Sequence, residues 1–126
     1  MRLLVDTHAL IWALTDPSRL SRRARSALED AENDVWVSAA SGYEIEFKRP
    51  RDAEIGRVPA ELAEAVLGMG FAWLAIDERH TIAAGRLPRL HGDPFDRLLA
   101  AQALVENLSV ITRDRAISAY GPPTLW

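Results

Sequence analysis

The sequence contains no cysteine, a single lysine (Lys48) and no long apolar run. The absence of cysteine excludes disulfide-stapled scaffolds, thiolate zinc sites, iron–sulfur clusters and cysteine nucleophiles. No run reaches the roughly 20 apolar residues that a membrane-spanning helix needs, because Asp6 interrupts the apolar N-terminal segment. The same aspartate argues against a secretory signal peptide. We therefore expect a cytoplasmic protein with no membrane partner.

Overall composition points to a folded protein. Hydrophobic residues make up 48% of the 126 residues and charged residues 26%, which excludes disordered and collagen-like chains. The length predicts a single domain over residues 1–126. The net charge of −3, from 18 acidic and 15 basic residues, offers no general attraction to nucleic acid.

Short apolar runs alternate along the chain with segments of helical spacing. Apolar runs without polar alternation indicate strands buried on both faces, as in parallel sheets. We expect strands over 2–5, 35–37, 71–76, 109–112 and, at an edge, 124–126. We expect helices over 8–14, 21–31, 38–48, 60–68, 77–86, 93–107 and from 114, with a surface loop over 49–59. The order predicts an α/β fold with a mostly parallel sheet of four to five strands covered on both faces.

Four acidic residues stand where ligands bind in such sheets, beyond the carboxyl ends of the strands. Asp6 directly follows the first strand, and Asp114 follows Ile111 of the fourth. Asp96 lies in the first turn of the helix that leads into the fourth strand, and Glu44 lies on the helix after the second. Oxygen ligands alone suit Mg²⁺ or Mn²⁺. Spacing permits these four carboxylates to share one such site.

Helix capping offers another interpretation of several acidic residues. Asp93 before Pro94 is an ordinary helix opening, which places Asp96 where a carboxylate favours the helix dipole. Asp114 could equally cap the short helix that follows it.

The two remaining acids differ in how well capping explains them. Ser41 and Glu44 have the spacing of a capping box. If Thr7 caps the helix that follows the first strand, capping does not account for Asp6. Asp6 is therefore the strongest functional candidate.

Cationic and aromatic residues near the acids are open to both interpretations. Lys48 and Arg97 lie on the helices that carry Glu44 and Asp96, where either could pair with a carboxylate or contact a phosphate. His91 borders the acidic helix and is the histidine best placed to contact substrate. Most of the tryptophans lie in apolar runs and are expected in the core.

Four segments resemble the VapC-type toxins of the PIN-domain nucleases. They are residues 4–10 (LVDTHAL), 37–45 (VSAASGYEI), 93–103 (DPFDRLLAAQA) and 110–114 (VITRD). The resemblance runs from end to end in the same order, and the DPFDR stretch is highly specific. Two departures are Gly92, where relatives often carry histidine or arginine, and the loop after Lys48.

The resemblance implies a three-layer α/β/α PIN fold and an endoribonuclease toxin of a toxin–antitoxin pair. It implies Mg²⁺ or Mn²⁺ as cofactor, RNA as substrate, a VapB-like antitoxin as partner and a homodimer. The apolar segments 8–14 and 36–47 could form the dimer interface. The family's acidic pocket corresponds to Asp6, Glu44, Asp96 and Asp114, with Asp93 as an accessory acid. Asp6, Asp96 and Asp114 would hold the metal, although the choice between Asp93 and Asp96 stays open.

Other functions remain open or are excluded by single residues. A catalytically idle PIN-like binding module and a solitary RNA-processing nuclease are the open alternatives. A haloacid-dehalogenase-type phosphatase needs an acid where His8 stands. A receiver domain needs an acid pair at the first strand and a late lysine, whereas Lys48 comes too early.

Overall fold

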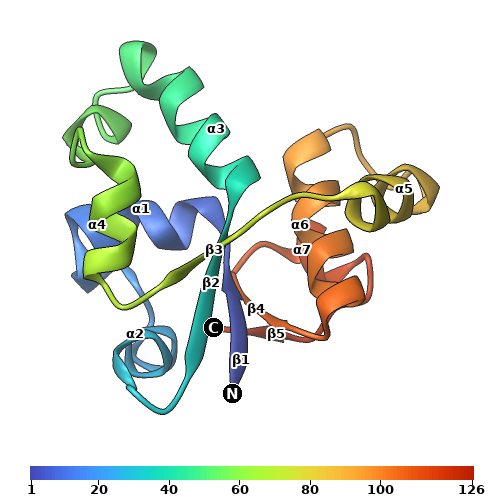
Figure 1. Cartoon of the computed structure of the whole chain (residues 1–126), viewed down its shortest axis with the longest axis horizontal. Coiled ribbons are helices and arrows are strands. Elements are labelled where there is room, and N and C mark those ends of the chain that lie inside the picture. The colour runs from blue at the N-terminus through green and yellow to red at the C-terminus, as the bar shows by residue number, and fades with distance from the viewer.

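The computed structural model, which describes residues 1–126, contains one five-stranded sheet in which all strands run parallel. The strand order is β3-β2-β1-β4-β5 (Figure 1). The strands are β1 (Arg2–Val5), β2 (Asp34–Ser38), β3 (Ala72–Leu74), β4 (Ser109–Ile111) and β5 (Thr124–Leu125). Leu4 in the central strand pairs with Trp36 on one side and with Val110 on the other. The chain moves outward from β1 to β3 and then returns to the other side of β1, so the topological switch point lies between β1 and β4.

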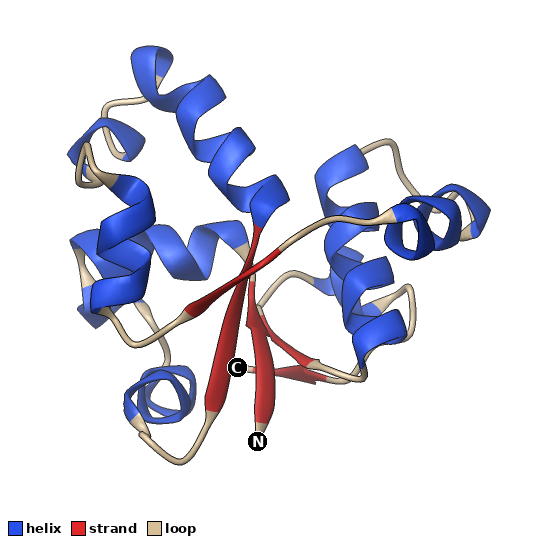
Figure 2. Ribbon diagram, in the orientation of Figure 1, coloured by secondary structure: helices blue, strands red, loops and turns tan.

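Helices cover both faces of the sheet and give three layers (Figure 2). One side carries α1 (Thr7–Thr15), α2 (Arg22–Glu29), α3 (Ala39–Lys48) and α4 (Leu62–Gly68). The other side carries α5 (Glu78–Arg86), α6 (Pro94–Glu106) and α7 (Arg115–Ser118). Three short 3-10 helices, η1 (Pro17–Arg19), η2 (Arg49–Arg51) and η3 (Ile55–Arg57), lie in the connections. The predicted α/β/α class is confirmed, and the sheet is parallel throughout.

The central strand divides the hydrophobic core in two. Leu3 and Val5 point into the larger cluster, which packs against α1, α2 and α4, while Leu4 points into the smaller cluster with α6 and α7. Alternate residues of a strand face opposite sides of a sheet, so both faces of β1 are apolar and buried. This burial holds the carboxyl end of β1, where Asp6 stands, at the centre of the fold.

Three sequence predictions about local structure need correction. The loop over 49–59 contains the two 3-10 helices η2 and η3. The helix expected over 60–68 ends at Gly68 but begins later, at Leu62, and the chain then reverses at Gly70, whose φ of 82° suits glycine. Residues 8–14 do not form an apolar surface, because most of this segment of α1 is buried in the core.

The tryptophans follow the core prediction to different degrees. Trp12 is buried, whereas Trp36 and Trp73 are half-buried and pack against the edges of the two clusters. No helix in the structure has both the length and the apolar character needed to cross a membrane.

Candidate active site at the carboxyl edge of the sheet

Asp6 is the N-cap residue of α1, and the prediction that capping would not account for it is wrong. Its Oδ1 accepts a hydrogen bond from the Ala9 backbone N–H at 2.7 Å. Thr7 is instead the first residue of the helix, and its Oγ1 lies 2.9 Å from the Ser41 hydroxyl of α3. The cap fixes the Asp6 carboxylate where β1 gives way to α1.

Asp93 and Asp114 cap α6 and α7, as their sequence positions predicted. Oδ1 of Asp93 accepts from the Phe95 backbone N–H at 2.8 Å, and Oδ1 of Asp114 accepts from the Ala116 N–H at 2.8 Å. Each cap uses Oδ1 and leaves Oδ2 free of any hydrogen bond within the chain. Capping and ligand binding are therefore compatible roles for the same carboxylate.

All five predicted acids line one cavity of about 80 Å³ at the carboxyl edge of the sheet. Its walls are formed by Asp6, Thr7, His8, Glu44, Lys48, Asp93, Asp96, Leu99 and Asp114. The acids come from the start of α1, the middle of α3 and the starts of α6 and α7. Residues separated by up to about a hundred positions in the chain thus meet because parallel strands end at the same edge of the sheet.

The carboxylates in this cavity repel one another. Burial, followed by the nearby charges of Asp93 and Asp114, raises the pKa of Asp96 to about 7. Burial also raises the pKa of Asp6. Two hydrogen bonds, one from the side chain of Thr112 and one from the Ala9 N–H, partly oppose this shift. A pKa near 7 for an aspartate means that the free pocket holds this negative charge unfavourably at neutral pH. A bound cation would relieve the repulsion.

Glu44 is 6% exposed and has a cation beside it. Lys48 Nζ donates to its Oε2 at 2.6 Å, across one turn of α3. The capping-box interpretation of Ser41 and Glu44 is wrong, because α3 begins earlier, at Ala39, with Ser38 as its N-cap. Glu44 is therefore free to face the cavity from the second turn of the helix.

Arg97 does not face the cavity. Its guanidinium donates to the backbone carbonyls of Pro88, Ala84 and Leu87 at 2.8, 2.6 and 2.9 Å. Arg97 thus fastens α6 to the end of α5 and pairs with no carboxylate. His91 bridges the starts of α6 and α7, accepting from the Asp93 N–H at 3.3 Å through Nδ1 while Nε2 lies 3.4 Å from the Ala116 carbonyl.

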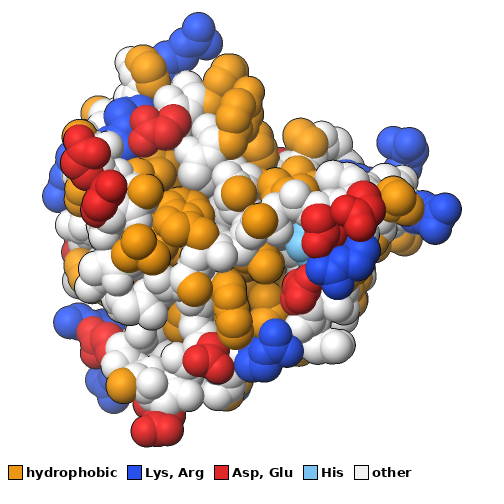
Figure 3. Space-filling view, in the orientation of Figure 1, with side chains coloured by type: hydrophobic (Ala, Val, Ile, Leu, Met, Phe, Trp, Pro, Cys, Tyr) orange, Lys and Arg blue, Asp and Glu red, His pale blue; other side chains and the backbone are white.

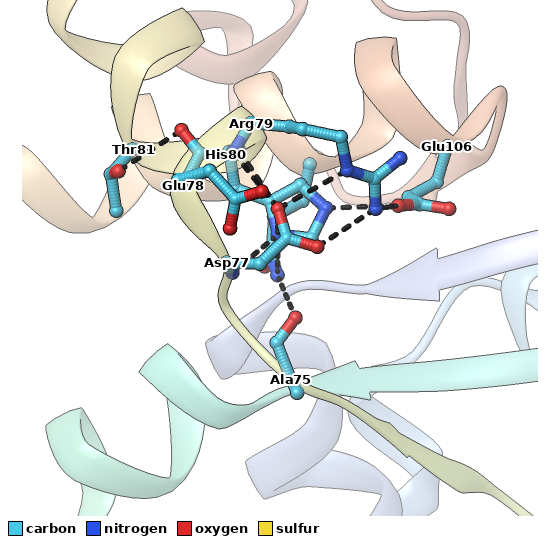
Figure 4. A network of polar contacts seen from close by, with 8 residues as sticks. Ala75, Asp77, Glu78, Arg79, His80, Thr81 and Glu106 are labelled. Carbon is cyan, nitrogen blue, oxygen red and sulfur yellow. Dashed lines mark hydrogen bonds and ion pairs between the residues drawn. The ribbon is translucent and has the colours of Figure 1, made fainter.

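A second acidic group lies away from this cavity, between α5 and α6. One ligand atom from each of Asp77, His80 and Glu106 lies within 4.8 Å of the others, so the group could hold a metal ion. Figure 4 shows that the guanidinium of Arg79 already lies between the two carboxylates. His80 Nδ1 accepts from the Asp77 N–H at 3.0 Å, so its Nε2 carries the proton and donates to Glu106 at 3.0 Å. These contacts satisfy the group without an ion.

The carboxylate oxygens of the acidic cavity lie further apart than the ligand atoms of Asp77, His80 and Glu106. Its carboxylates form no set of three oxygen atoms within 4.8 Å of one another. Mg²⁺ binds through one or two carboxylates and keeps several waters, so its sites do not require a closed shell of protein ligands. The donor set of several carboxylates with no thiolate fits a hard divalent cation.

Sequence reasoning missed the residues beside the acids. Arg113, Arg115 and Trp126 line a larger hollow that shares Asp6 and Asp114 with the acidic cavity. The sequence offers one signal for the two arginines, which is that they stand on either side of Asp114.

Comparisons with known proteins assign the fold to a family. The PIN domain profile matches residues 3–121. Ribonuclease VapC22 from Mycobacterium tuberculosis is 30% identical, with 98% of each chain covered.

Solved structures share the fold at lower identity. A DNA-bound VapBC from Salmonella typhimurium has a TM-score of 0.74 at 16% identity, covering 99% of this chain and 97% of the other. FitAcB from Neisseria gonorrhoeae has a TM-score of 0.66 at 19% identity, covering 98% and 96%. The match of the domain profile over nearly the whole chain, together with the ribonuclease relative, shows that this chain belongs to the PIN-domain family and to its VapC-type branch.

Proposed function

We propose that the chain is the toxin of a toxin–antitoxin pair and acts as a Mg²⁺- or Mn²⁺-dependent endoribonuclease. The observation that carries this proposal is the convergence of Asp6, Glu44, Asp96 and Asp114 on one cavity at the switch point of the sheet. The similarity to a VapC ribonuclease supports RNA as the substrate. Such an enzyme would act on RNA in the cytoplasm, with residues 1–126 as one nuclease domain.

Asp6, Asp96 and Asp114 would hold the metal, directly or through water, and Asp93 would serve as an accessory acid. A bound divalent cation supplies charge stabilisation at the phosphoryl oxygen and lowers the pKa of water. Between Asp93 and Asp96, the cavity favours Asp96 as the direct ligand. Asp96 is half-buried and lies among the charges of Asp93, Asp114 and Glu44, whereas Asp93 is exposed.

Glu44 would orient the attacking water. Its Oε2 is held by Lys48, which fixes the carboxylate and leaves Oε1 to accept a hydrogen bond from water. The water oxygen then forms a bond to phosphorus while the bond from phosphorus to the 3′ oxygen breaks. Solvent takes the water's proton and supplies one to the leaving 3′ oxygen. The resemblance to VapC-type toxins is the basis for this choice of bond, which gives a 5′-phosphate and a 3′-hydroxyl.

Partners follow from the same relationship. The structural neighbours include VapBC complexes and a toxin–antitoxin complex from Klebsiella pneumoniae, so we propose a VapB-like antitoxin for this chain. An acidic cavity suits a basic antitoxin segment. We also propose a homodimer, for which α3 offers an exposed apolar face through Tyr43 and Phe47.

The direct experiment is cleavage of single-stranded RNA by the purified chain with Mg²⁺ and with EDTA. We expect EDTA, Asp6→Ala and Asp96→Ala each to abolish cleavage. Arg25→Ala, on the exposed face of α2, is the matched control and should cleave normally. Cleavage that survives chelation or both acid substitutions would overturn the mechanism. Metal-independent RNA binding without cleavage would favour an idle binding module.

A further inference from the structure

The largest hollow of the molecule, about 370 Å³, adjoins the acidic cavity and has a different chemical character. The two share Asp6, His8 and Asp114. Beyond these shared residues, the walls of the larger hollow are cationic and aromatic, and they consist of Trp12, Arg113, Arg115 and Trp126. The scissile phosphate placed at the acids would therefore have arginines and tryptophans immediately to one side.

Arg113 is held in place by an aromatic platform. Its guanidinium lies over the ring of Trp12 at 4.7 Å, and that of Arg19 lies over the same ring at 4.7 Å. Trp12 is 4% exposed, and its Nε1 donates to Glu54 at 3.0 Å. Because the platform is fixed, Arg113 is oriented before any ligand arrives.

Neither arginine of the hollow is neutralised within the chain. Arg113 and Arg115 are exposed and form no ion pair or side-chain hydrogen bond, although Asp114 stands between them in the sequence. Asp114 instead uses Oδ1 to cap α7. By contrast, Arg19, Arg25, Arg49 and Arg79 all pair with acids. The two guanidinium groups next to the acidic cavity thus keep their donors available.

The hollow continues beyond Asp114, into a part that neither Asp6 nor His8 lines. A further hollow of about 230 Å³ shares Arg113, Asp114, Arg115 and Trp126 and adds the hydroxyls of Thr112, Ser118 and Thr124. Together with the acidic cavity these form adjoining hollows along the starts of α1 and α7. Arginine donates in pairs to phosphate oxygens, and bases of single strands stack on aromatic rings.

We propose that the hollow lined by Arg113, Arg115 and Trp126 binds the nucleotide next to the scissile phosphate, an inference that rests on the proposed ribonuclease activity. Arg113 and Arg115 contact the adjacent phosphate, and the half-buried Trp126, whose ring lies 5.9 Å from that of Trp12, packs against the base. The ligand class is single-stranded RNA that enters along one side of the acidic cavity. Arg113, Arg115 and Trp126 are therefore substrate-positioning residues.

Binding is measured by the fluorescence anisotropy of a 5′-fluorescein oligoribonucleotide with Mg²⁺ present, in an Asp96→Asn background that prevents cleavage. Arg113→Ala and Arg115→Ala should each raise Kd about tenfold. Each should also make the dependence of the log association constant on log salt concentration less steep by about 0.7, the value for one lost phosphate contact on a single strand. Trp126→Ala should raise Kd about tenfold without changing the slope, and Trp126→Phe should restore the affinity.

Arg22→Ala and Arg23→Ala are the controls, because they remove the same charge from exposed positions on α2. Equal Kd and slope in the hollow variants and these controls would overturn the inference. Retained RNA affinity with weakened binding of an acidic peptide would also overturn it, in favour of a protein partner.

A second measurement separates this inference from the proposed function. Hydrolysis of bis(p-nitrophenyl) phosphate reports on the acidic cavity without any flanking nucleotide. In the otherwise native chain, Arg113→Ala and Arg115→Ala should raise the KM for RNA about tenfold and change the kinetics of the small ester much less, whereas Asp96→Asn should abolish hydrolysis of both. Normal RNA kinetics in these variants would refute the nucleotide site alone, whereas a native chain without metal-dependent cleavage would refute the proposed function itself.

Discussion

Lys48 Nζ lies 2.6 Å from Oε2 of Glu44, which places the one lysine of the chain against the one glutamate of the acidic cavity. The hydrogen bond to Glu44, with smaller contributions from Asp93 and Asp52, raises the pKa of Lys48. The ammonium therefore stays charged and neutralises part of the cavity before any metal binds.

Replacing this ammonium should weaken the fold and strengthen metal binding. Lys48→Met leaves the Glu44 carboxylate buried without its donor, so we expect a loss of about 1–3 kcal/mol in the free energy of unfolding of the metal-free chain. Mn²⁺ affinity should rise, because the cavity loses a positive charge. Denaturant unfolding and calorimetric titration measure the two effects.

The matched control is Arg25→Met, which removes the i,i+4 partner of Glu29. Both side chains of this pair are exposed. Such a surface pair contributes about 0–1 kcal/mol. If Lys48→Met were no more destabilising than Arg25→Met, or bound Mn²⁺ more weakly than the native chain, the electrostatic account of the cavity would be wrong.

The raised pKa of Asp96 makes stability depend on pH in the absence of metal. The folded pKa of about 7 lies above the ordinary value of 3.8, so the folded chain binds the proton more tightly than the unfolded chain. The resulting stabilisation is fully present below about pH 4 and is lost as pH rises towards 7 and above it. Asp96→Asn should raise the Tm of the metal-free chain at pH 8 and change it little at pH 4.

Mg²⁺ should have the corresponding effect on the native chain. It should raise the Tm more at pH 8, where Asp96 is ionised, than at pH 5, where a proton competes with the metal. Thermal scans at the two pH values, with EDTA as reference, provide the check. An Asp96→Asn variant less stable than the native chain at pH 8 without metal would contradict the prediction.

The buried His80 holds α5 to α6 and takes no part in the proposed chemistry. It is 1% exposed and bonds both the Asp77 N–H and Glu106. His80→Ala should therefore lower the free energy of unfolding by about 2–4 kcal/mol through lost packing and two lost hydrogen bonds. Cleavage at a temperature where the variant is folded should be unchanged.

Glu78→Ala, at the exposed neighbouring position, serves as the control for this variant and should change the free energy of unfolding little. A folded His80→Ala chain that requires more metal for cleavage than the native chain would show that Asp77, His80 and Glu106 form a functional metal site.

The aromatic face of α3 should carry the proposed dimer. Tyr43 and Phe47 are 62% and 64% exposed, and their rings stack at 5.8 Å. Hydrophobic side chains line the α3 side of the notch in the molecular outline (Figure 3). Tyr43→Ser combined with Phe47→Ser should give a monomer by light scattering at micromolar concentration.

Leu67→Ser is the control for the dimer variant, because Leu67 is similarly exposed on α4. It should leave the dimer intact. A native chain that is already monomeric, or a double variant that still dimerises, would contradict the assignment.

Local sequence patterns predicted the fold well because they depend on near neighbours. Apolar runs without alternation marked strands buried on both faces, and Ser38, Asp93 and Asp114 marked helix starts that the structure confirms. The prediction about Asp6 is wrong because one carboxylate can cap a helix and face a ligand site at the same time. Its carboxylate caps α1 through one oxygen and still lines the cavity.

Contacts between distant segments could not be predicted in the same way. Arg97 turns to carbonyls at the end of α5, and no local pattern specifies that direction. The stacking of Arg113 on Trp12 joins residues 101 positions apart, so the cationic hollow was visible only in three dimensions. The acids were within reach of sequence reasoning because the end of each parallel strand is fixed by topology.

The central claim, that the acidic cavity holds the catalytic metal, is tested most directly by measuring Mn²⁺ binding and RNA cleavage on the same three proteins. These are the native chain, Asp96→Asn and Glu106→Gln, the last of which alters the other acidic group. We predict that Asp96→Asn weakens Mn²⁺ binding at least about tenfold and abolishes cleavage, while Glu106→Gln retains both. Loss of metal binding and cleavage in Glu106→Gln, with both retained in Asp96→Asn, would contradict the account.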